Sequence, residues 1–128
     1  MAKTRILIAE DEAALRFLLT ETLEDEGYEV AEAEDGRAAL ELLAGETYDL
    51  IILDYMMPEH TGIEVCERLR SGDGPNSGKP VILLTAKAQE QDRKRAEQVG
   101  VSRYIAKPFS PLQLLDEIEE LLSAEGQE

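Results

Sequence analysis

The chain has 128 residues, which is enough for one domain with an ordinary hydrophobic core. Hydrophobic residues make up 43% of the chain and charged residues 32%, values typical of globular proteins, which exclude a disordered or collagen-like chain. The formal net charge of -15 disfavours direct binding to nucleic acids or anionic membranes, because such a field repels phosphate groups.

The single cysteine, Cys66, excludes an intrachain disulfide and a cysteine metal cluster, and it indicates a reducing compartment. We expect it to be a small buried hydrophobic side chain in the third predicted helix. No stretch of the sequence approaches the roughly 20 apolar residues that a membrane span requires. We therefore expect a cytoplasmic protein.

Five short apolar runs alternate with five longer segments of helical periodicity, a pattern typical of parallel βαβ units. The third and fourth runs are continuously apolar, as expected for central strands covered on both faces. The predicted strands are residues 5–9, 28–33, 49–53, 80–84 and 103–106. The sequence therefore predicts an α/β fold with a parallel sheet.

The predicted helices are residues 12–26, 37–44, 62–70, 90–99 and 111–123. Gly27, Gly45 and Gly100 each follow a helical segment, where a left-handed C-cap is common, and Pro111 suits the first turn of the last helix. Residues 71–78 are rich in Gly, Ser, Pro and Asn, and we expect a surface loop there.

Chemistry in an open α/β sheet is expected beyond the carboxyl ends of its strands. In this chain the first predicted strand is followed by Glu10 and Asp11, the third by Asp54, the fourth by Thr85 and the fifth by Lys107. Three carboxylic acids, one hydroxyl group and one ammonium group are therefore expected to converge on one edge of the sheet.

This acidic cluster needs a compensating positive charge, because carboxylates about 5 Å apart repel by roughly 3 kcal/mol per pair at an effective dielectric constant near 20. A hard divalent cation such as Mg²⁺ provides that charge. Asp11 and Asp54 suit direct ligation, together with a backbone carbonyl just beyond Asp54. Phosphoryl transfer to a carboxylate depends mainly on positioning and charge neutralisation, so the pattern predicts a phosphoacceptor aspartate beside a metal ion.

The ammonium group of Lys107 suits a phosphate oxygen, and it would hold a carboxylate before phosphorylation. The hydroxyl group of Thr85 offers a hydrogen-bond donor. We expect the bond between Lys107 and Pro108 to be a cis peptide that aims the lysine inward.

The sequence closely resembles the response-regulator receiver domains of bacterial two-component signalling. The resemblance covers residues 4–122, so we expect residues 1–128 to form a single receiver domain. The matching motifs are Ile8-Ala9-Glu10-Asp11, Leu53-Asp54-Tyr55-Met56-Met57-Pro58 with Gly62 beyond, Leu84-Thr85-Ala86, and Tyr104-Ile105-Ala106-Lys107-Pro108-Phe109.

The resemblance implies a doubly wound five-stranded sheet in the order 2-1-3-4-5 with five helices, the flavodoxin-like and CheY-like fold. It implies that Asp54 takes a phosphoryl group from a phosphohistidine on a histidine kinase or a histidine phosphotransfer protein. Asp11, Asp54 and the Met56 carbonyl would hold Mg²⁺, or Mn²⁺ in its place, with Glu10 acting through water. Glu10 departs from the aspartate that is commoner at this position. Such a domain is a signalling phosphoacceptor that promotes only its own phosphorylation and slow dephosphorylation.

The resemblance also implies a switch in which Thr85 moves toward the phosphate and Tyr104 turns inward behind it. A downstream protein would then recognise the fourth helix, fifth strand and fifth helix. Met56 and Lys87 would tune the rate of dephosphorylation, and Leu15 or Leu18 would belong to a kinase-docking patch on the first helix.

Simpler interpretations of single residues exist. Asp54 alone is compatible with capping the loop after a strand, and Asp11 with the N-cap of the first helix. Thr85 and Tyr104 are compatible with ordinary strand packing. We expect His60 to face solvent and to take no part in the chemistry.

Two other classes of protein compete with a signalling domain. A haloacid-dehalogenase-like phosphatase usually carries a second acid two residues after its nucleophile, where this chain has Met56, and it carries a cap domain that this chain lacks. A flavodoxin-like electron carrier needs a hydroxyl- and glycine-rich phosphate loop after the first strand, where this chain has Glu10-Asp11-Glu12.

Overall fold

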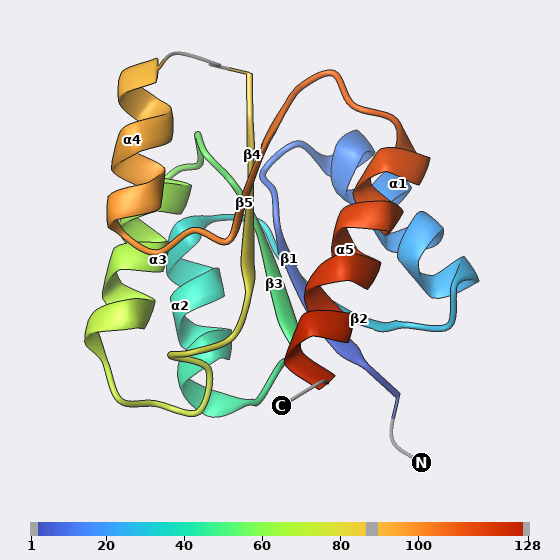
Figure 1. Ribbon diagram of the computed structural model, residues 1–128, viewed down its shortest axis with the longest axis horizontal. Helices are drawn as coiled ribbons and strands as arrows, with labels where there is room; N and C mark the ends of the chain where they lie inside the picture. Colours follow the sequence, from blue (N-terminus) through green and yellow to red (C-terminus); the bar gives the residue numbers. More distant parts are fainter. Residues whose placement is uncertain (1–2, 87–89, 127–128) are drawn as a thin grey trace.

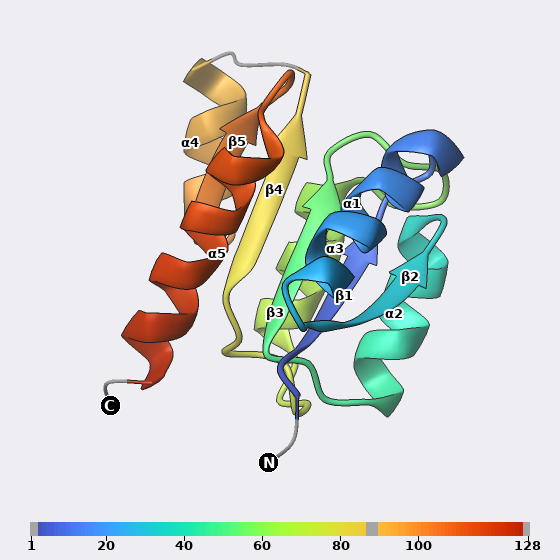
Figure 2. The ribbon, with the colours of Figure 1, turned by 90° about the vertical axis from the view of Figure 1, so that its right-hand side faces the viewer.

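The protein folds around one parallel sheet with helices on both faces. The computed structural model describes residues 3–86 and 90–126, and these contain five strands in the order β2-β1-β3-β4-β5. Figure 2 shows the strands lying side by side in this order. The predicted fold and strand order are therefore confirmed.

The strands lie close to their predicted positions. They are β1 Arg5–Ala9, β2 Glu29–Ala33, β3 Leu50–Asp54, β4 Val81–Thr85 and β5 Arg103–Ala106. All residues of β3 and β4 are buried, as predicted for central strands. Both strands begin and end one residue later than predicted, so Asp54 and Thr85 are the last residues of their strands and still pair with neighbouring strands.

The helices form two layers, one on each face of the sheet. They are α1 Ala13–Asp25, α2 Gly36–Gly45, α3 Gly62–Ser71, α4 Glu90–Gln98 and α5 Pro111–Gly126. Figure 1 shows α1 and α5 on one side of the sheet and α2, α3 and α4 on the other. Alternate residues of each central strand point to opposite layers, which produces two hydrophobic cores.

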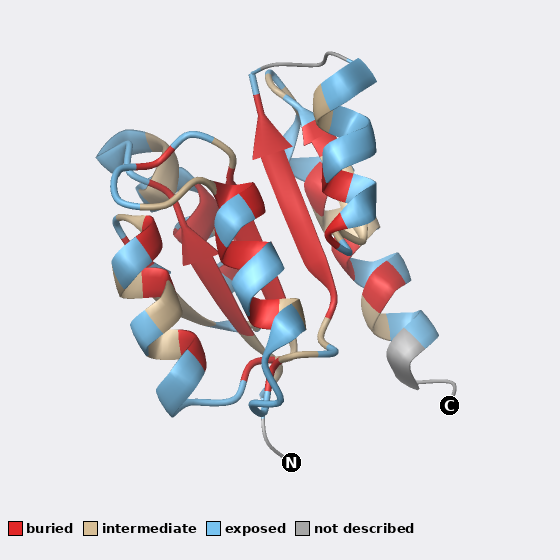
Figure 3. Ribbon diagram, turned by 90° about the vertical axis from the view of Figure 1, so that its left-hand side faces the viewer, coloured by how far each residue is buried: buried red, intermediate tan, exposed pale blue. Residues whose placement is uncertain are grey.

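The two cores explain why the sheet is stable. Leu7, Ile51 and Leu83 pack toward α2 and α3, whereas Ile52 and Leu84 pack toward α1 and α5. Burying each such side chain contributes about 1.5–3 kcal/mol. Figure 3 shows buried strands beneath helices whose outer faces are exposed, so the sheet is a rigid platform for the loops at its ends.

The helix ends agree with the predictions at some positions and correct them at others. Gly27 and Gly100 have φ angles of 93° and 92°, so both adopt the predicted left-handed conformation. Gly45 is not among the glycines with positive φ, because it belongs to the last turn of α2 and the extended Glu46 caps that helix; its predicted left-handed cap is wrong. The N-cap of α1 is Glu12, which makes no side-chain capping bond, so Asp11 does not cap this helix.

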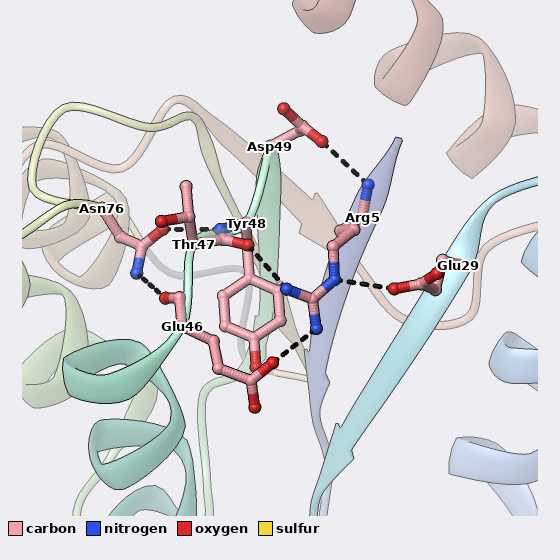
Figure 4. A network of polar contacts seen from close by, with 7 residues as sticks. All are labelled: Arg5, Glu29, Glu46, Thr47, Tyr48, Asp49 and Asn76. Carbon is pink, nitrogen blue, oxygen red and sulfur yellow. Dashed lines mark hydrogen bonds and ion pairs between the residues drawn. The ribbon is translucent and has the colours of Figure 1, made fainter. Parts of the chain in front are cut away.

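The predicted surface loop at residues 71–78 contains one fully buried polar side chain, Asn76. Its Oδ1 accepts a hydrogen bond from the Tyr48 backbone N–H at 2.7 Å, and its Nδ2 donates to the Glu46 carbonyl at 2.6 Å (Figure 4). Its Nδ2 also donates to the Leu43 carbonyl at 2.8 Å. The amide of Asn76 therefore ties this loop to the connection between α2 and β3.

Arg5 binds the same connection from the amino-terminal edge of the sheet. Its guanidinium group forms ion pairs with Glu29 at 2.8 Å and Glu46 at 2.7 Å, and it lies 5.0 Å from the ring centre of Tyr48 (Figure 4). This network lies at the opposite end of the strands from Asp54, so we assign it to the stability of the fold.

No described helix combines the length and the apolar character that crossing a bilayer requires.

Candidate functional site

Three carboxyl groups meet at the carboxyl ends of β1 and β3. Glu10, Asp11 and Asp54 each offer one oxygen atom, and these atoms all lie within 4.8 Å of one another. Glu10 and Asp54 are only 1% and 5% exposed, whereas Asp11 is exposed. The structure therefore brings together the acids that the sequence predicted to converge.

Lys107 reaches this cluster from the end of β5. Its Nζ lies 2.6 Å from Oδ1 of Asp54 and 3.4 Å from Oε1 of Glu10. The peptide bond between Lys107 and Pro108 is cis, as predicted. The Lys107 backbone N–H donates to the Thr85 carbonyl at 2.7 Å, which attaches this segment to the end of β4.

Burial and mutual repulsion make the ionised carboxylates of the cluster costly. Burial raises the pKa of Asp54, and the charge of Asp11 raises it further, although Lys107 and the Met56 backbone N–H act in the opposite direction. Burial likewise raises the pKa of Glu10, with a smaller contribution from the charge of Asp54.

The same environment favours the charged form of Lys107. Burial alone would lower its pKa, but the hydrogen bond and charge of Asp54, together with Glu10, outweigh burial and raise that pKa. One ammonium group thus faces three carboxyl groups, which leaves the cluster with an excess of negative charge.

The donor set fits a hard divalent cation. All of the converging donors are carboxylate oxygens, which Mg²⁺ prefers, and the exposed side chain of Asp11 leaves room for the waters that Mg²⁺ retains. A bound cation would compensate the excess negative charge that Lys107 leaves. The cluster is therefore a candidate magnesium site.

Gly62 allows the backbone to pass close to Asp54. A Cβ atom on Gly62 would lie 2.5 Å from the Asp54 carbonyl oxygen and 2.6 Å from Cδ1 of Leu83. Its N–H donates to the Tyr55 carbonyl at 2.8 Å, and α3 begins at this residue behind a capping box formed by Thr61 and Glu64. Any larger side chain at position 62 would therefore clash with the Asp54 backbone, which explains the glycine in the sequence motif.

The predicted switch residues lie on β4 and β5. Thr85 ends β4 and is 1% exposed, and Tyr104 is partly buried on β5. Burial raises the pKa of Tyr104, and a side-chain hydrogen bond with Thr85 opposes that effect. Met56 is 56% exposed, and Lys87 lies outside the described residues. The functional roles of these residues stay predictions.

The observed environments of Cys66, His60, Leu15 and Leu18 can be compared with their predicted environments. Cys66 is fully buried, as predicted, and its thiol donates to the Val99 carbonyl at 3.5 Å. His60 is partly buried, so the expectation that it faces solvent holds only in part. Leu15 packs against the core beneath α1, whereas Leu18 is 50% exposed.

Two polar contacts near the cluster were missed from the sequence. The Tyr55 hydroxyl group donates to Oδ1 of Asp92 at 3.0 Å, which links the residue after Asp54 to α4. Arg16 donates from Nη1 to the Glu10 carbonyl at 2.7 Å. A basic residue at the start of a helix, where the helix dipole disfavours it, was the available signal for Arg16.

Comparison with known proteins identifies the class to which this fold and acidic cluster belong. The family model of the response regulator receiver domain matches residues 6–119. The chain belongs to the response-regulator receiver family of two-component signalling. This membership supports a signalling phosphoacceptor over the phosphatase and the flavodoxin-like electron carrier.

The chain is similar to receiver domains from regulators and from sensor kinases. It is 42% identical over 125 residues to the transcriptional regulatory protein ResD of Bacillus subtilis, covering 98% of this chain and 50% of ResD. The CheY-like receiver domain protein from Methanospirillum hungatei is 29% identical, with a TM-score of 0.92 and 98% coverage of both chains. The chain spans about half the length of the curated relatives it matches.

One similar structure contains the expected metal ion. The receiver domain of the sensor histidine kinase PA1611 from Pseudomonas aeruginosa has magnesium coordinated in its active-site cleft. It is 29% identical to this chain, with a TM-score of 0.86, and the match covers 95% of this chain and 99% of that domain.

Proposed function

We propose that Asp54 accepts a phosphoryl group from a phosphohistidine on a histidine kinase or a histidine phosphotransfer protein. The observation that carries this proposal is the convergence of three carboxyl groups within 4.8 Å, with the Lys107 ammonium group 2.6 Å from Asp54. Residues 1–128 form a single receiver domain, with its core in residues 4–122, which acts in the cytoplasm.

Asp11, Asp54 and the Met56 backbone carbonyl would hold Mg²⁺, or Mn²⁺ in its place, and Glu10 would act through water. When bound, the cation neutralises charge on the carboxylates and on the incoming phosphoryl oxygens. Its ligands come from the ends of two adjacent strands, β1 and β3, so the fold holds them together before any phosphodonor arrives.

In the transfer step, an oxygen of Asp54 attacks phosphorus, the phosphorus–nitrogen bond of phosphohistidine breaks, and the imidazole leaves with its electron pair. Lys107 first holds the Asp54 carboxylate and then pairs with a phosphoryl oxygen. Hydrolysis of the resulting acyl phosphate by water returns Asp54 to its original form.

Thr85 then donates its hydroxyl hydrogen to the phosphoryl group, and Tyr104 turns inward behind it. A downstream protein recognises the face formed by α4, β5 and α5. That face has a hollow of about 410 Å³, lined in part by Tyr104, Arg103 and Glu117. The hydrogen bond from Tyr55 to Asp92 supports a connection between the phosphoacceptor strand and α4.

The phosphodonor docks beside Lys107. An apolar hollow of about 250 Å³ lies between α1 and the segment after β5, and Leu18 and Phe109 line it. Leu18 is 50% exposed, so this apolar surface is open to a partner. A donor helix seated there would bring its histidine near Asp54.

The test is phosphorylation with acetyl phosphate and Mg²⁺, measured by intact mass spectrometry. We expect the addition of one phosphoryl group, which EDTA prevents and Asp54→Asn abolishes. The matched control is Asp116→Asn, which removes an exposed carboxylate from α5 and should leave labelling unchanged. Full labelling of the Asp54→Asn protein would overturn the proposal.

A further inference from the structure

Arg16 contacts the acidic cluster through the backbone of Glu10 and not through a carboxylate. Its Nη1 donates to the Glu10 backbone carbonyl at 2.7 Å, and its Nε forms an ion pair with Oε1 of Glu32 at 3.1 Å. The Arg16 side chain is only 18% exposed, whereas Glu32 is an exposed residue of β2. The guanidinium group therefore connects α1, the loop after β1 and β2.

The position of Arg16 within α1 explains how it reaches this loop. Helical side chains lean toward the amino terminus, so an arginine at the fourth residue of the helix extends back over the first turn to Glu10. The positive end of the helix dipole disfavours a cation there, and the first turn of α1 contains no acidic residue to compensate. The two contacts of Arg16 with Glu10 and Glu32 offset that disadvantage.

Arg16 completes the set of restraints on Glu10. The Glu10 N–H donates to the Ala33 carbonyl at 3.0 Å, and its Oε2 accepts from the Glu12 N–H at 3.1 Å. The Glu10 carbonyl is the remaining backbone group, and Arg16 binds it. Because Arg16 binds a carbonyl oxygen, it fixes the loop without occupying the carboxylates that face Asp54.

We propose that Arg16 is a positioning residue for the metal site. It holds the loop after β1 so that Glu10 and Asp11 face Asp54, and it thereby increases the affinity for a divalent cation. This inference rests on the proposed function, because the cation concerned is the one required for phosphorylation of Asp54.

The sign of the change in affinity separates positioning from simple electrostatics. The guanidinium group is a cation, so its charge alone opposes binding of Mg²⁺, and its removal would tighten binding. Loss of a residue that orients metal ligands weakens binding, typically by about 10–100-fold. Positioning predicts weaker metal binding in Arg16→Ala, whereas a charge effect predicts tighter binding.

The experiment titrates the purified chain with Mn²⁺, measures free Mn²⁺ by electron paramagnetic resonance, and displaces the bound ion with Mg²⁺. We expect Arg16→Ala to weaken binding about 10-fold. Arg16→Lys, which keeps one donor and the charge, should recover part of this loss. Glu32→Gln, which removes the second anchor, should weaken binding by a smaller factor. The matched control is Arg37→Ala, which removes an exposed arginine of α2 that pairs with Glu41 at 3.7 Å.

Unchanged or tighter Mn²⁺ binding in folded Arg16→Ala would overturn the inference, as would an equal loss in Arg37→Ala. If Arg16→Ala does not fold, as judged by circular dichroism, Arg16→Lys and Glu32→Gln decide the question. In that case parental affinity in both variants overturns the inference.

A second measurement separates the positioning role from the proposed function. Acetyl phosphate labelling of Arg16→Ala should require a higher Mg²⁺ concentration for its half-maximal rate and should approach the parental rate at saturation. A reduced rate at saturating Mg²⁺ with unchanged half-maximal concentration would contradict a metal-positioning role. Failure of the parent chain itself to bind Mn²⁺ or to be labelled would instead refute the proposed function.

Discussion

Neutralising Asp11 should stabilise the metal-free protein and greatly reduce its response to Mg²⁺. The Asp11 oxygen lies within 4.8 Å of oxygens on Glu10 and Asp54, and among the described residues no cationic group forms an ion pair with Asp11. Asp11→Asn therefore removes two repulsive pairs and breaks no ion pair between described residues.

The size of this gain follows from Coulomb's law. At 4.8 Å, each carboxylate pair costs about 0.9 kcal/mol in water and about 3.5 kcal/mol at an effective dielectric constant of 20. Asp11 is exposed, so the value for water applies and solvent screening reduces it further. We therefore expect Asp11→Asn to raise the free energy of unfolding by about 1–2 kcal/mol.

The assay is urea unfolding near pH 7 at low ionic strength, with EDTA or with excess Mg²⁺. Mg²⁺ at 100 times its dissociation constant should stabilise the parent by about 2.7 kcal/mol and Asp11→Asn by much less. The control Asp116→Asn should keep the full response. A less stable Asp11→Asn protein in EDTA, or an undiminished response to Mg²⁺, would refute the reasoning.

Three further predictions concern other parts of the structure. Asn76→Ala should lower the free energy of unfolding by about 2–4 kcal/mol, because it leaves buried backbone groups without partners; an unchanged urea midpoint would contradict this role. Gly62→Ala should lower the melting temperature and slow acetyl phosphate labelling, since its Cβ would lie 2.5 Å from the Asp54 carbonyl oxygen; normal labelling would show that the loop adjusts freely. In EDTA, stability should fall as pH rises from the ordinary carboxyl pKa through the raised pKa values of Asp54 and Glu10, because the folded state binds more protons there. Urea midpoints across this pH range should show a smaller fall in a variant carrying Asp54→Asn and Glu10→Gln, and an equal fall would contradict the assignment.

Much of the fold could be predicted because it depends on repeated patterns. Continuous apolar runs predicted β3 and β4. Asp54 and Thr85 were expected directly after these strands, and they are the last residues of the strands, a difference of one residue. The error of one residue has a physical reason, because the polar last residue of each strand still pairs with a neighbouring strand. An apolar pattern therefore ends before the strand does.

The residues that were missed act through specific tertiary hydrogen bonds. Asn76 lies among residues typical of turns, and only the packing of its loop against Leu43, Glu46 and Tyr48 buries it. Arg16 likewise bonds to Glu10 because the first turn of α1 places its side chain over the loop after β1. The spacing of residues in the sequence predicts which face of a helix or strand is buried, but it does not predict an individual hydrogen bond between two segments.

The charges in the acidic cluster explain why the proposed function calls for both Lys107 and a metal ion. At an effective dielectric constant of 20, Lys107 attracts Asp54 by about 6 kcal/mol at 2.6 Å, while the buried Glu10 repels it by about 3.5 kcal/mol at 4.8 Å. The exposed Asp11 adds only about 0.9 kcal/mol of repulsion at the dielectric constant of water, so Lys107 alone can hold the unphosphorylated aspartate in place. A phosphoryl group adds further negative charge at the same position, which the single ammonium group cannot balance. For the proposed transfer to Asp54, the cluster therefore needs a divalent cation, and the exposed side chain of Asp11 leaves a path for that cation to enter.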